Sequence, residues 1–288
     1  MSDPSRSRLP TEPDTSIVVP AWGPYGGTPL NEALESLRTQ DFAARVIVVD
    51  NASDQPLPSL QGVELVRAPR RQTVGAARNM GLEHVTTPYV LFWDADDLML
   101  PGTLRFLRDR ISSHPALVAV AARILEDEPR VPHRWPRRSM APLTRLPRAF
   151  ALAHSVWSLF PTTGSTIMRT AAVRESGGYA DANSGEDWVL GVSLAFRGRL
   201  EIHLRPGRVY RRHVGSLWEH RRSPRHLLRH AAAVQERLRS DPGIPGWAKL
   251  LVPAIAVLQV IAVIAVRPLA RAGRALLLAA RAERRQVR

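Results

Sequence analysis

Three carboxylates lie within four residues of the sequence, at Asp94-Ala-Asp-Asp97, directly after the apolar run 89–93. Carboxylates this close repel one another, so a fold that gathers them gains from a bound cation. Oxygen ligands suit Mg²⁺ or Mn²⁺, and either ion can bridge the oxygens of a diphosphate. A solvated turn in which Asp97 caps the next helix would explain the same residues without a metal.

Two other segments carry residue types that can bind a ligand. Asp50 ends an apolar run, and its carboxylate can accept a hydrogen bond from a ribose hydroxyl or a base N–H, although Asp50-Asn-Ala-Ser53 also makes a good turn. Gly75-Ala-Ala-Arg78 combines small residues, which allow close backbone approach, with an arginine suited to phosphate. Helix packing accounts for the glycine and the alanines more readily than for Arg78.

Glu186-Asp187 precedes an apolar segment and is a candidate for proton transfer. A carboxylate held partly away from water can act as a general base toward a substrate hydroxyl. Capping of the following helix by Asp187 is the simpler alternative. Farther on, Tyr210-Arg-Arg-His213 supplies a histidine that can reach phosphate or metal, although a single histidine is more often structural.

The elements that must position these residues alternate along the chain. Apolar, β-branched runs at 16–20, 46–49, 63–66 and 89–93 predict strands, and helical patterns at 30–37 and 73–85 lie between them. This alternation predicts an α/β fold with a mostly parallel sheet flanked by helices. Because ligands bind beyond the carboxyl ends of such strands, Asp50 and Asp94 should lie at one edge. Later, a strand at 164–168 and helices at 170–176 and 188–196 are expected.

Charge is distributed unevenly along the 288 residues. The net charge is +14, yet residues 1–204 hold 22 basic and 22 acidic side chains, whereas residues 205–288 hold 18 and 4. The first two-thirds therefore has no basic excess for nucleic-acid binding. The absence of cysteine excludes disulfides and thiolate metal sites. With Lys249 as the only lysine, the arginine-rich composition favours a GC-rich bacterial genome.

Taken in order, these motifs resemble glycosyltransferase family 2, whose members have the nucleotide-sugar-binding GT-A fold. The similar segments are the opening strand Ser16–Pro20, the loop Val48–Asp54, Gly75–Gly81, the metal loop Phe92–Asp97, Gly177–Trp188 and the closing loop Val209–Ser216. The resemblance covers roughly residues 15–217. The sequence departs from the family at Ala21-Trp-Gly-Pro24, which replaces the usual Thr-Tyr-Asn, and at Asn51, where many members carry a second Asp.

This resemblance implies an inverting sugar transfer from a nucleotide-diphosphate donor. Asp50 would hold the nucleoside, Asp94 and Asp96 would bind Mg²⁺ or Mn²⁺ across the diphosphate, and Asp187 would deprotonate the acceptor hydroxyl. His213 would add a metal or phosphate contact. The donor-binding residues implied in this way are Pro20, Asp50, Arg78, Asp94 and His213.

The end of the sequence has a membrane-binding pattern. Residues 250–266 form a run of 17 residues that is apolar except for Pro253 and Gln259. This length is the lower limit for a membrane-spanning helix. Six arginines of residues 267–288 recur at helical spacing on one face, which is typical of helices that bind anionic lipid. A span would export a tail of net +6, against the positive-inside tendency, so we expect a helix that lies in or dips into the cytosolic leaflet. A soluble helical cap packed on the catalytic domain is the alternative.

These patterns predict four regions: a disordered lead at 1–14, a GT-A catalytic domain at 15–220, a basic helical linker at 221–246 and a membrane-associating tail at 247–288. The lead is polar and lacks the apolar core of a secretory signal, so we expect the catalytic part to stay in the cytosol. Within the catalytic domain, residues 126–150 are rich in Pro and Arg and are expected to form a mobile loop or an insertion on the acceptor side. The predicted function is sugar transfer at the cytosolic membrane face to a lipid-linked or cell-envelope acceptor.

Two other functions remain open from the sequence. A nucleotidyltransferase also uses an α/β sheet and acidic metal loops, but it usually carries a basic, Gly-rich phosphate loop after its first strand, and residues 21–28 have no basic side chain. A catalytically inactive transferase-like protein that binds lipid or nucleic acid would be expected to lose its acidic site residues. Asp50, Asp94, Asp96 and Asp187 are all present.

Overall fold

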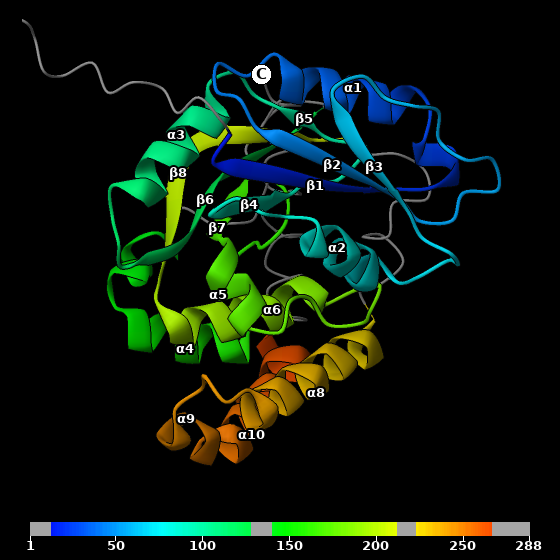
Figure 1. Cartoon of the computed structure of the whole chain (residues 1–288). Helices are drawn as coiled ribbons and strands as arrows, with labels where there is room; N and C mark the ends of the chain where they lie inside the picture. The colour runs from blue at the N-terminus through cyan, green and yellow to red at the C-terminus, as the bar shows by residue number, and fades with distance from the viewer. Residues whose placement is uncertain (1–12, 128–139, 212–222, 267–288) are drawn as a thin grey trace, which may run out of the picture.

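The computed structural model describes residues 13–127, 140–211 and 223–266. Within these ranges eight strands form one sheet, in the order β3-β2-β1-β4-β7-β6-β8-β5 (Figure 1). The strands are β1 (Thr15–Ala21), β2 (Arg45–Asp50), β3 (Val63–Arg67), β4 (Tyr89–Phe92), β5 (Leu98–Met99), β6 (Leu117–Glu126), β7 (Thr166–Arg169) and β8 (Arg199–Tyr210). Strands β3, β2, β1 and β4 run parallel, β6 and β8 run parallel to each other, and β7 and β5 run antiparallel to their neighbours. The predicted α/β fold with a mostly parallel sheet is confirmed.

Helices cover both faces of the sheet because successive strand residues point to opposite sides. On one face, Ile17 and Val19 of β1 belong to a buried core with α1 (Thr28–Arg38) and α3 (Thr103–Ser112). On the other face, Val18 belongs to a core with α2 (Val74–Glu83), α4 (Pro147–Val156), α5 (Thr170–Glu175) and α6 (Glu186–Arg197). Helix α2 approaches the sheet closely, since a Cβ at Gly81 would lie 2.3 Å from Val18. This close packing fixes the last turn of α2 against β1 and β2.

Part of the predicted loop at 126–150 is helical. After β6, residues 128–139 lie outside the described ranges, but the chain then forms a 3-10 turn at Pro142–Arg145 (η3) and begins α4 at Pro147. Phe150 and Ala151 of α4 are buried against the sheet. The expectation of a loop was therefore wrong for residues 142–150, because two apolar residues in a Pro-rich and Arg-rich stretch are enough to anchor a helix.

The C-terminal helices pack on the rest of the molecule. Helices α8 (Pro224–Ser240), α9 (Gly246–Leu250) and α10 (Val252–Ile261) form a layer beyond α4 and α6, and a π-helical turn follows at Ala262–Val266 (Figure 1). Trp188 and Val192 of α6 share a buried core with Val234 and Leu238 of α8, and Ile255 of α10 joins it. The described parts of the predicted linker and tail are thus joined to the catalytic domain through apolar packing.

The layer also exposes apolar side chains. Among the described helices, none is long and apolar enough to cross a membrane. One side of α10 is buried, but Val257, Ile261 and Ile264 are between 48% and 62% exposed, and Leu250 is 82% exposed. Residues 1–12 of the predicted lead and the six terminal arginines lie outside the described residues.

Candidate active site

The structure brings the sequence-predicted carboxylates to one edge of the sheet. Asp50 is the last residue of β2, and Asp94 to Asp97 follow β4, on either side of β1. Pro20 lies on β1 between them, in register with Val49. The parallel strand order therefore places these groups where a ligand of an open α/β sheet is expected.

Asp50 is buried and organises the loop that follows β2. Its carboxylate accepts hydrogen bonds from the backbone N–H of Ser53 (2.9 Å) and of Leu57 (3.3 Å), and it pairs with Arg67. Burial alone would raise the pKa of Asp50, but these hydrogen bonds and the Arg67 guanidinium lower it, so the group is ionised at neutral pH. A nucleoside contact by Asp50 stays a prediction.

A chain of alternating buried charges links the acidic loop to α6. Arg78 donates to Glu186 (2.7 Å) and to Asp94 (2.8 Å), and Arg208 of β8 donates to the other oxygen of Asp94 (2.6 Å) and pairs with Asp97. Burial opposes charge on Arg78 and Arg208, but the adjacent carboxylates outweigh it and raise the pKa of both. The same arginines lower the pKa of Asp94 against the effect of its burial.

These pairs change what can be expected of two predicted residues. A phosphate contact from Arg78 would require one of its buried ion pairs to open. Asp94 likewise has each of its two oxygens on an arginine, so a metal bound there would share those oxygens with the two guanidinium groups. The phosphate role of Arg78 came from residue type and the metal role of Asp94 from the family resemblance, and neither took account of the arginine at position 208.

Asp96 is the carboxylate that best fits a metal ligand. Asp97 is fully buried, and its pKa is raised to about 7 by that burial and by the neighbouring Asp96 and Asp94, despite Arg208. Asp96 is partly exposed, and its backbone carbonyl accepts a hydrogen bond from Arg211. In the ranges that the structure describes, no group of three His, Asp or Glu side chains could hold a metal, and His213 lies outside them. Because Mg²⁺ is commonly held by one or two carboxylates together with substrate phosphates, Asp96 fits such an ion without an all-protein cage.

Asp187 lies in the first turn of α6, after Gly185 at a positive φ of 80°. The N-cap of α6 is Gly185, but one Asp187 oxygen accepts a hydrogen bond from the backbone N–H of Trp188 (2.8 Å) and so satisfies a free donor of the first turn. Burial, together with the adjacent Glu186 carboxylate, raises the pKa of Asp187 to about 7. A carboxylate of this pKa is half ionised at neutral pH and basic enough to take a proton from a hydroxyl in a transition state.

The loop that precedes Asp187 is held from two sides. Toward α2, Asn183 accepts a hydrogen bond from Val74 N–H (3.0 Å), and the Ala182 carbonyl accepts one from Gly75 N–H (3.1 Å). A Cβ at Gly75 would lie 2.0 Å from the Ala180 carbonyl, so this glycine serves packing of the loop. Toward α8, Ser184 hydrogen-bonds with His230 (2.9 Å). The sequence offered no signal for these long-range contacts.

Residues 21–24, where the sequence departs from the family pattern, place an aromatic ring beside the edge of the sheet that carries Asp50 and Asp94. Trp22 follows β1 and is 39% exposed, and the Arg71 guanidinium lies 3.2 Å from the centre of its ring. A cation over an indole face is a favourable arrangement. An exposed indole with one stacked face is a feature that the family pattern did not predict.

Together, the parallel strands, the acidic loop after β4 and the carboxylate of raised pKa at the start of α6 fit a group-transfer enzyme of the GT-A type. Residues 16–175 match the model of Glycosyl transferase family 2. The chain belongs to this family, which makes it a glycosyltransferase by family.

Two curated relatives illustrate the family. The chain is 32% identical to the pre-mycofactocin glycosyltransferase of Mycobacterium tuberculosis (strain CDC 1551 / Oshkosh) over 65% of the chain and 39% of that protein. It is 27% identical to the succinoglycan biosynthesis protein ExoO of Rhizobium meliloti (strain 1021), over 71% of the chain and 62% of that protein. The chain thus matches less than two-thirds of the length of either relative.

Solved structures share the fold. Residues 1–349 of TarS from S. aureus, in complex with UDP-GlcNAc, superpose with a TM-score of 0.65 at 18% identity, covering 86% of this chain and 72% of the other. The mannosyltransferase PcManGT from Pyrobaculum calidifontis, in complex with GDP-Man and Mn²⁺, superposes with a TM-score of 0.59 at 21% identity, covering 96% and 81%. These likenesses support the GT-A fold.

Proposed function

We propose that this enzyme transfers a sugar from a nucleotide-diphosphate donor to an acceptor hydroxyl with inversion at the anomeric carbon. The observation that carries the proposal is Asp187, a partly buried carboxylate with a pKa of about 7. It adjoins Glu186, which Arg78 links by ion pairs to Asp94 of the acidic loop. Structural neighbours that bind UDP-GlcNAc and GDP-Man support a nucleotide-sugar donor. Family membership favours sugar transfer over the nucleotidyltransferase alternative.

In the proposed reaction, the oxygen of the acceptor hydroxyl attacks the anomeric carbon, and Asp187 accepts the proton of that hydroxyl. The attack comes from the face opposite the leaving nucleotide, so a single displacement inverts that carbon. Arg78 forms ion pairs with both Glu186 of α6 and Asp94 of the acidic loop. These two pairs hold the start of α6 beside that loop. Mg²⁺ or Mn²⁺ held by Asp96 would offset the negative charge on the departing diphosphate.

The proposal is tested by incubating the purified protein with a panel of nucleotide sugars and measuring release of the nucleoside diphosphate. We expect slow hydrolysis of one donor in the presence of Mg²⁺ or Mn²⁺, and loss of that hydrolysis with EDTA. Nucleoside triphosphates with a sugar phosphate serve as the control for nucleotidyl transfer. Pyrophosphate release from that mixture, without hydrolysis of any nucleotide sugar, would contradict the proposal.

We also propose that the enzyme works at the cytosolic membrane face, on a lipid-linked or cell-envelope acceptor. Val257, Ile261 and Ile264 are spaced by four and three, so their exposed side chains form one apolar face of the C-terminal layer. Monomeric soluble proteins rarely expose a contiguous apolar patch of this kind without a partner. The 22 residues that follow carry seven basic side chains and one acidic side chain, which suits an anionic lipid surface.

Membrane binding is expected to depend on that face. The double variant Val257→Asn/Ile261→Asn should bind anionic vesicles at least tenfold more weakly in co-sedimentation, because burial of each aliphatic side chain contributes roughly 1.5–3 kcal/mol. Leu146→Asn, which alters an apolar side chain of 59% exposure outside the layer, is the matched control. Salt should weaken wild-type binding without abolishing it, since only the arginine contribution is screened.

Surface substitutions are a better test than truncation after Asp241. Truncation would remove Ile244, Ala248 and Val252, which are buried against α6 and α8, and would expose the core of the layer. A wild-type protein that stays in the supernatant with anionic vesicles at low salt would contradict membrane binding.

A further inference from the structure

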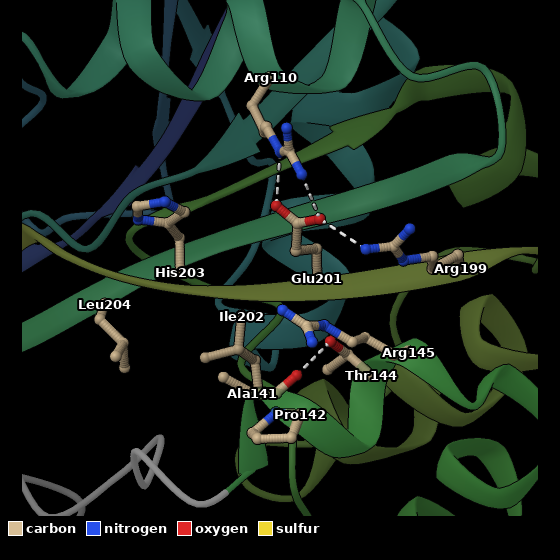
Figure 2. Close-up of a pocket in the computed structure, with 10 residues that line it drawn as sticks. All are labelled: Arg110, Ala141, Pro142, Thr144, Arg145, Arg199, Glu201, Ile202, His203 and Leu204. Atoms are coloured by element: carbon tan, nitrogen blue, oxygen red, sulfur yellow. Dashed lines mark hydrogen bonds and ion pairs between the residues drawn. The ribbon is translucent and has the colours of Figure 1, made fainter.

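The first half of β8 forms an open edge of the sheet. Strand β5 pairs only with Val209 and Arg208, so residues 199–205 have no described strand on that side. A cavity of about 810 Å³ lies along this edge (Figure 2). Its walls come from α3 on one face of the sheet, from η3 on the other face and from β8 between them. Glu201 lies seven residues before Arg208, which is roughly 20 Å along a strand, so the cavity is separate from the candidate active site.

One wall of the cavity holds a buried carboxylate between two arginines. Glu201 accepts from Arg110 at both oxygens (2.6 and 2.9 Å) and from Arg199 at one of them (2.9 Å), as Figure 2 shows. Burial would raise the pKa of Glu201, but the hydrogen bonds and charge of Arg110 and the charge of Arg199 lower it, so it is ionised. One negative charge thus faces two positive charges, and this wall has a net charge of about +1.

The cavity contains further unused cationic donors. Arg145 of η3 lines it and is exposed, and no described carboxylate pairs with its guanidinium. Arg199 also lines the cavity, and only its Nη2 is hydrogen-bonded to Glu201. Because a guanidinium has five N–H donors, Arg199 keeps further donors for an anion. With Arg145, the net charge around the cavity is about +2.

Most of the remaining lining is apolar, apart from Thr144 and His203. Ala141 and Pro142 at the start of η3, with Ile202 and Leu204 of β8, contribute hydrocarbon surface to the same cavity. A small inorganic anion would leave this surface without a partner. An anion attached to an apolar body would satisfy the arginine donors and cover the hydrocarbon surface at once.

We propose that this cavity binds a phosphate monoester carried on an apolar body, with Arg145 and Arg199 as the phosphate ligands. The dianionic charge of a phosphate monoester matches the net positive charge of the cavity, whereas a carboxylate supplies half of it. The site lies outside the segment that the donor chemistry uses, so it does not depend on the proposed function.

The test is to titrate the full-length protein separately with phenyl phosphate, inorganic phosphate and benzoate in the presence of EDTA. Binding is monitored by NMR or calorimetry. We expect saturable binding of phenyl phosphate, with inorganic phosphate and benzoate each at least tenfold weaker. Arg145→Glu should weaken phenyl phosphate binding by about tenfold or more, because hydrogen bonds to charged groups contribute on that scale. Arg148→Glu makes the same charge change at an exposed arginine outside the cavity, and it should bind like the wild type.

Arg199→Gln provides a second variant, with a thermal melt to check that the loss of its Glu201 pair leaves the protein folded. A folded Arg199→Gln protein should also lose affinity for phenyl phosphate. Equal losses in Arg145→Glu and Arg148→Glu would show a general charge effect and overturn the proposal. So would benzoate binding as tightly as phenyl phosphate, or no saturable binding by the wild type.

Discussion

Asp187→Asn is expected to lower the rate of sugar transfer on the order of 10²- to 10⁴-fold, which is the usual loss when a general base is removed. Asparagine can still accept the hydrogen bond from Trp188 N–H that Asp187 accepts at 2.8 Å, so α6 should keep its first turn. Donor affinity, measured by calorimetry with a nucleoside diphosphate and Mn²⁺, should change little because the proposed base faces the acceptor.

The pH dependence of the wild type should carry the same signature. A base must be deprotonated to act, and burial with the adjacent Glu186 raises the pKa of Asp187 to about 7. The value of kcat/KM should therefore rise about tenfold per pH unit below pH 7 and level off above it. The residual activity of Asp187→Asn should not show this rise of kcat/KM with pH.

Asp181→Asn is the matched control for Asp187→Asn. Asp181 lies on the same loop and accepts a hydrogen bond from Thr73 (2.5 Å), but it is exposed and outside the buried charge chain. If Asp181→Asn lost as much activity, disturbance of the loop would explain both variants. Normal turnover by Asp187→Asn would leave this residue as a helix cap only.

The sequence could predict that the carboxylates meet at one edge of the sheet, but not which arginines neutralise them. Strands such as Ser16–Pro20 are short and β-branched, and their order follows from general rules for parallel sheets, so the meeting of Asp50 with Asp94 was predictable. The ion pairs of Arg208 were not, because they join distant residues: the pair with Asp94 spans 114 positions in the sequence. No local pattern distinguishes a buried arginine that pairs with Asp94 from an exposed one.

The C-terminal region shows the same limit for apolar residues. Residues 250–266 are almost uniformly apolar, so their periodicity does not tell which side packs inward. In the structure Val252 and Ile255 are buried in the layer while Val257 and Ile261 are exposed. The sequence analysis treated membrane binding and soluble capping as alternatives. Under the proposed function both apply to α10: its buried face packs on the catalytic domain, and its exposed face binds the membrane.

Asp96→Ala is expected to reduce transfer on the order of 10³-fold or more, since a catalytic metal supplies several kcal/mol of charge stabilisation and each 1.4 kcal/mol is tenfold in rate. The fold should survive because Asp96 is partly exposed, unlike Asp97, which is fully buried and pairs with Arg208. A thermal melt close to that of the wild type would establish this.

Metal binding supplies a readout that does not depend on turnover. Titration with Mn²⁺ and a nucleoside diphosphate, followed by the paramagnetic signal of the ion, should show at least tenfold weaker formation of the ternary complex with Asp96→Ala than with the wild type. Asp54→Ala removes an exposed carboxylate from the loop after β2 and should bind the ion normally. If Asp96→Ala transferred sugar at the wild-type rate with EDTA present, metal-dependent chemistry at Asp96 would be wrong. The charge on the leaving diphosphate would then have to be balanced by protein cations such as Arg211, whose guanidinium pairs with Glu32 and donates to the Asp96 carbonyl beside the acidic loop.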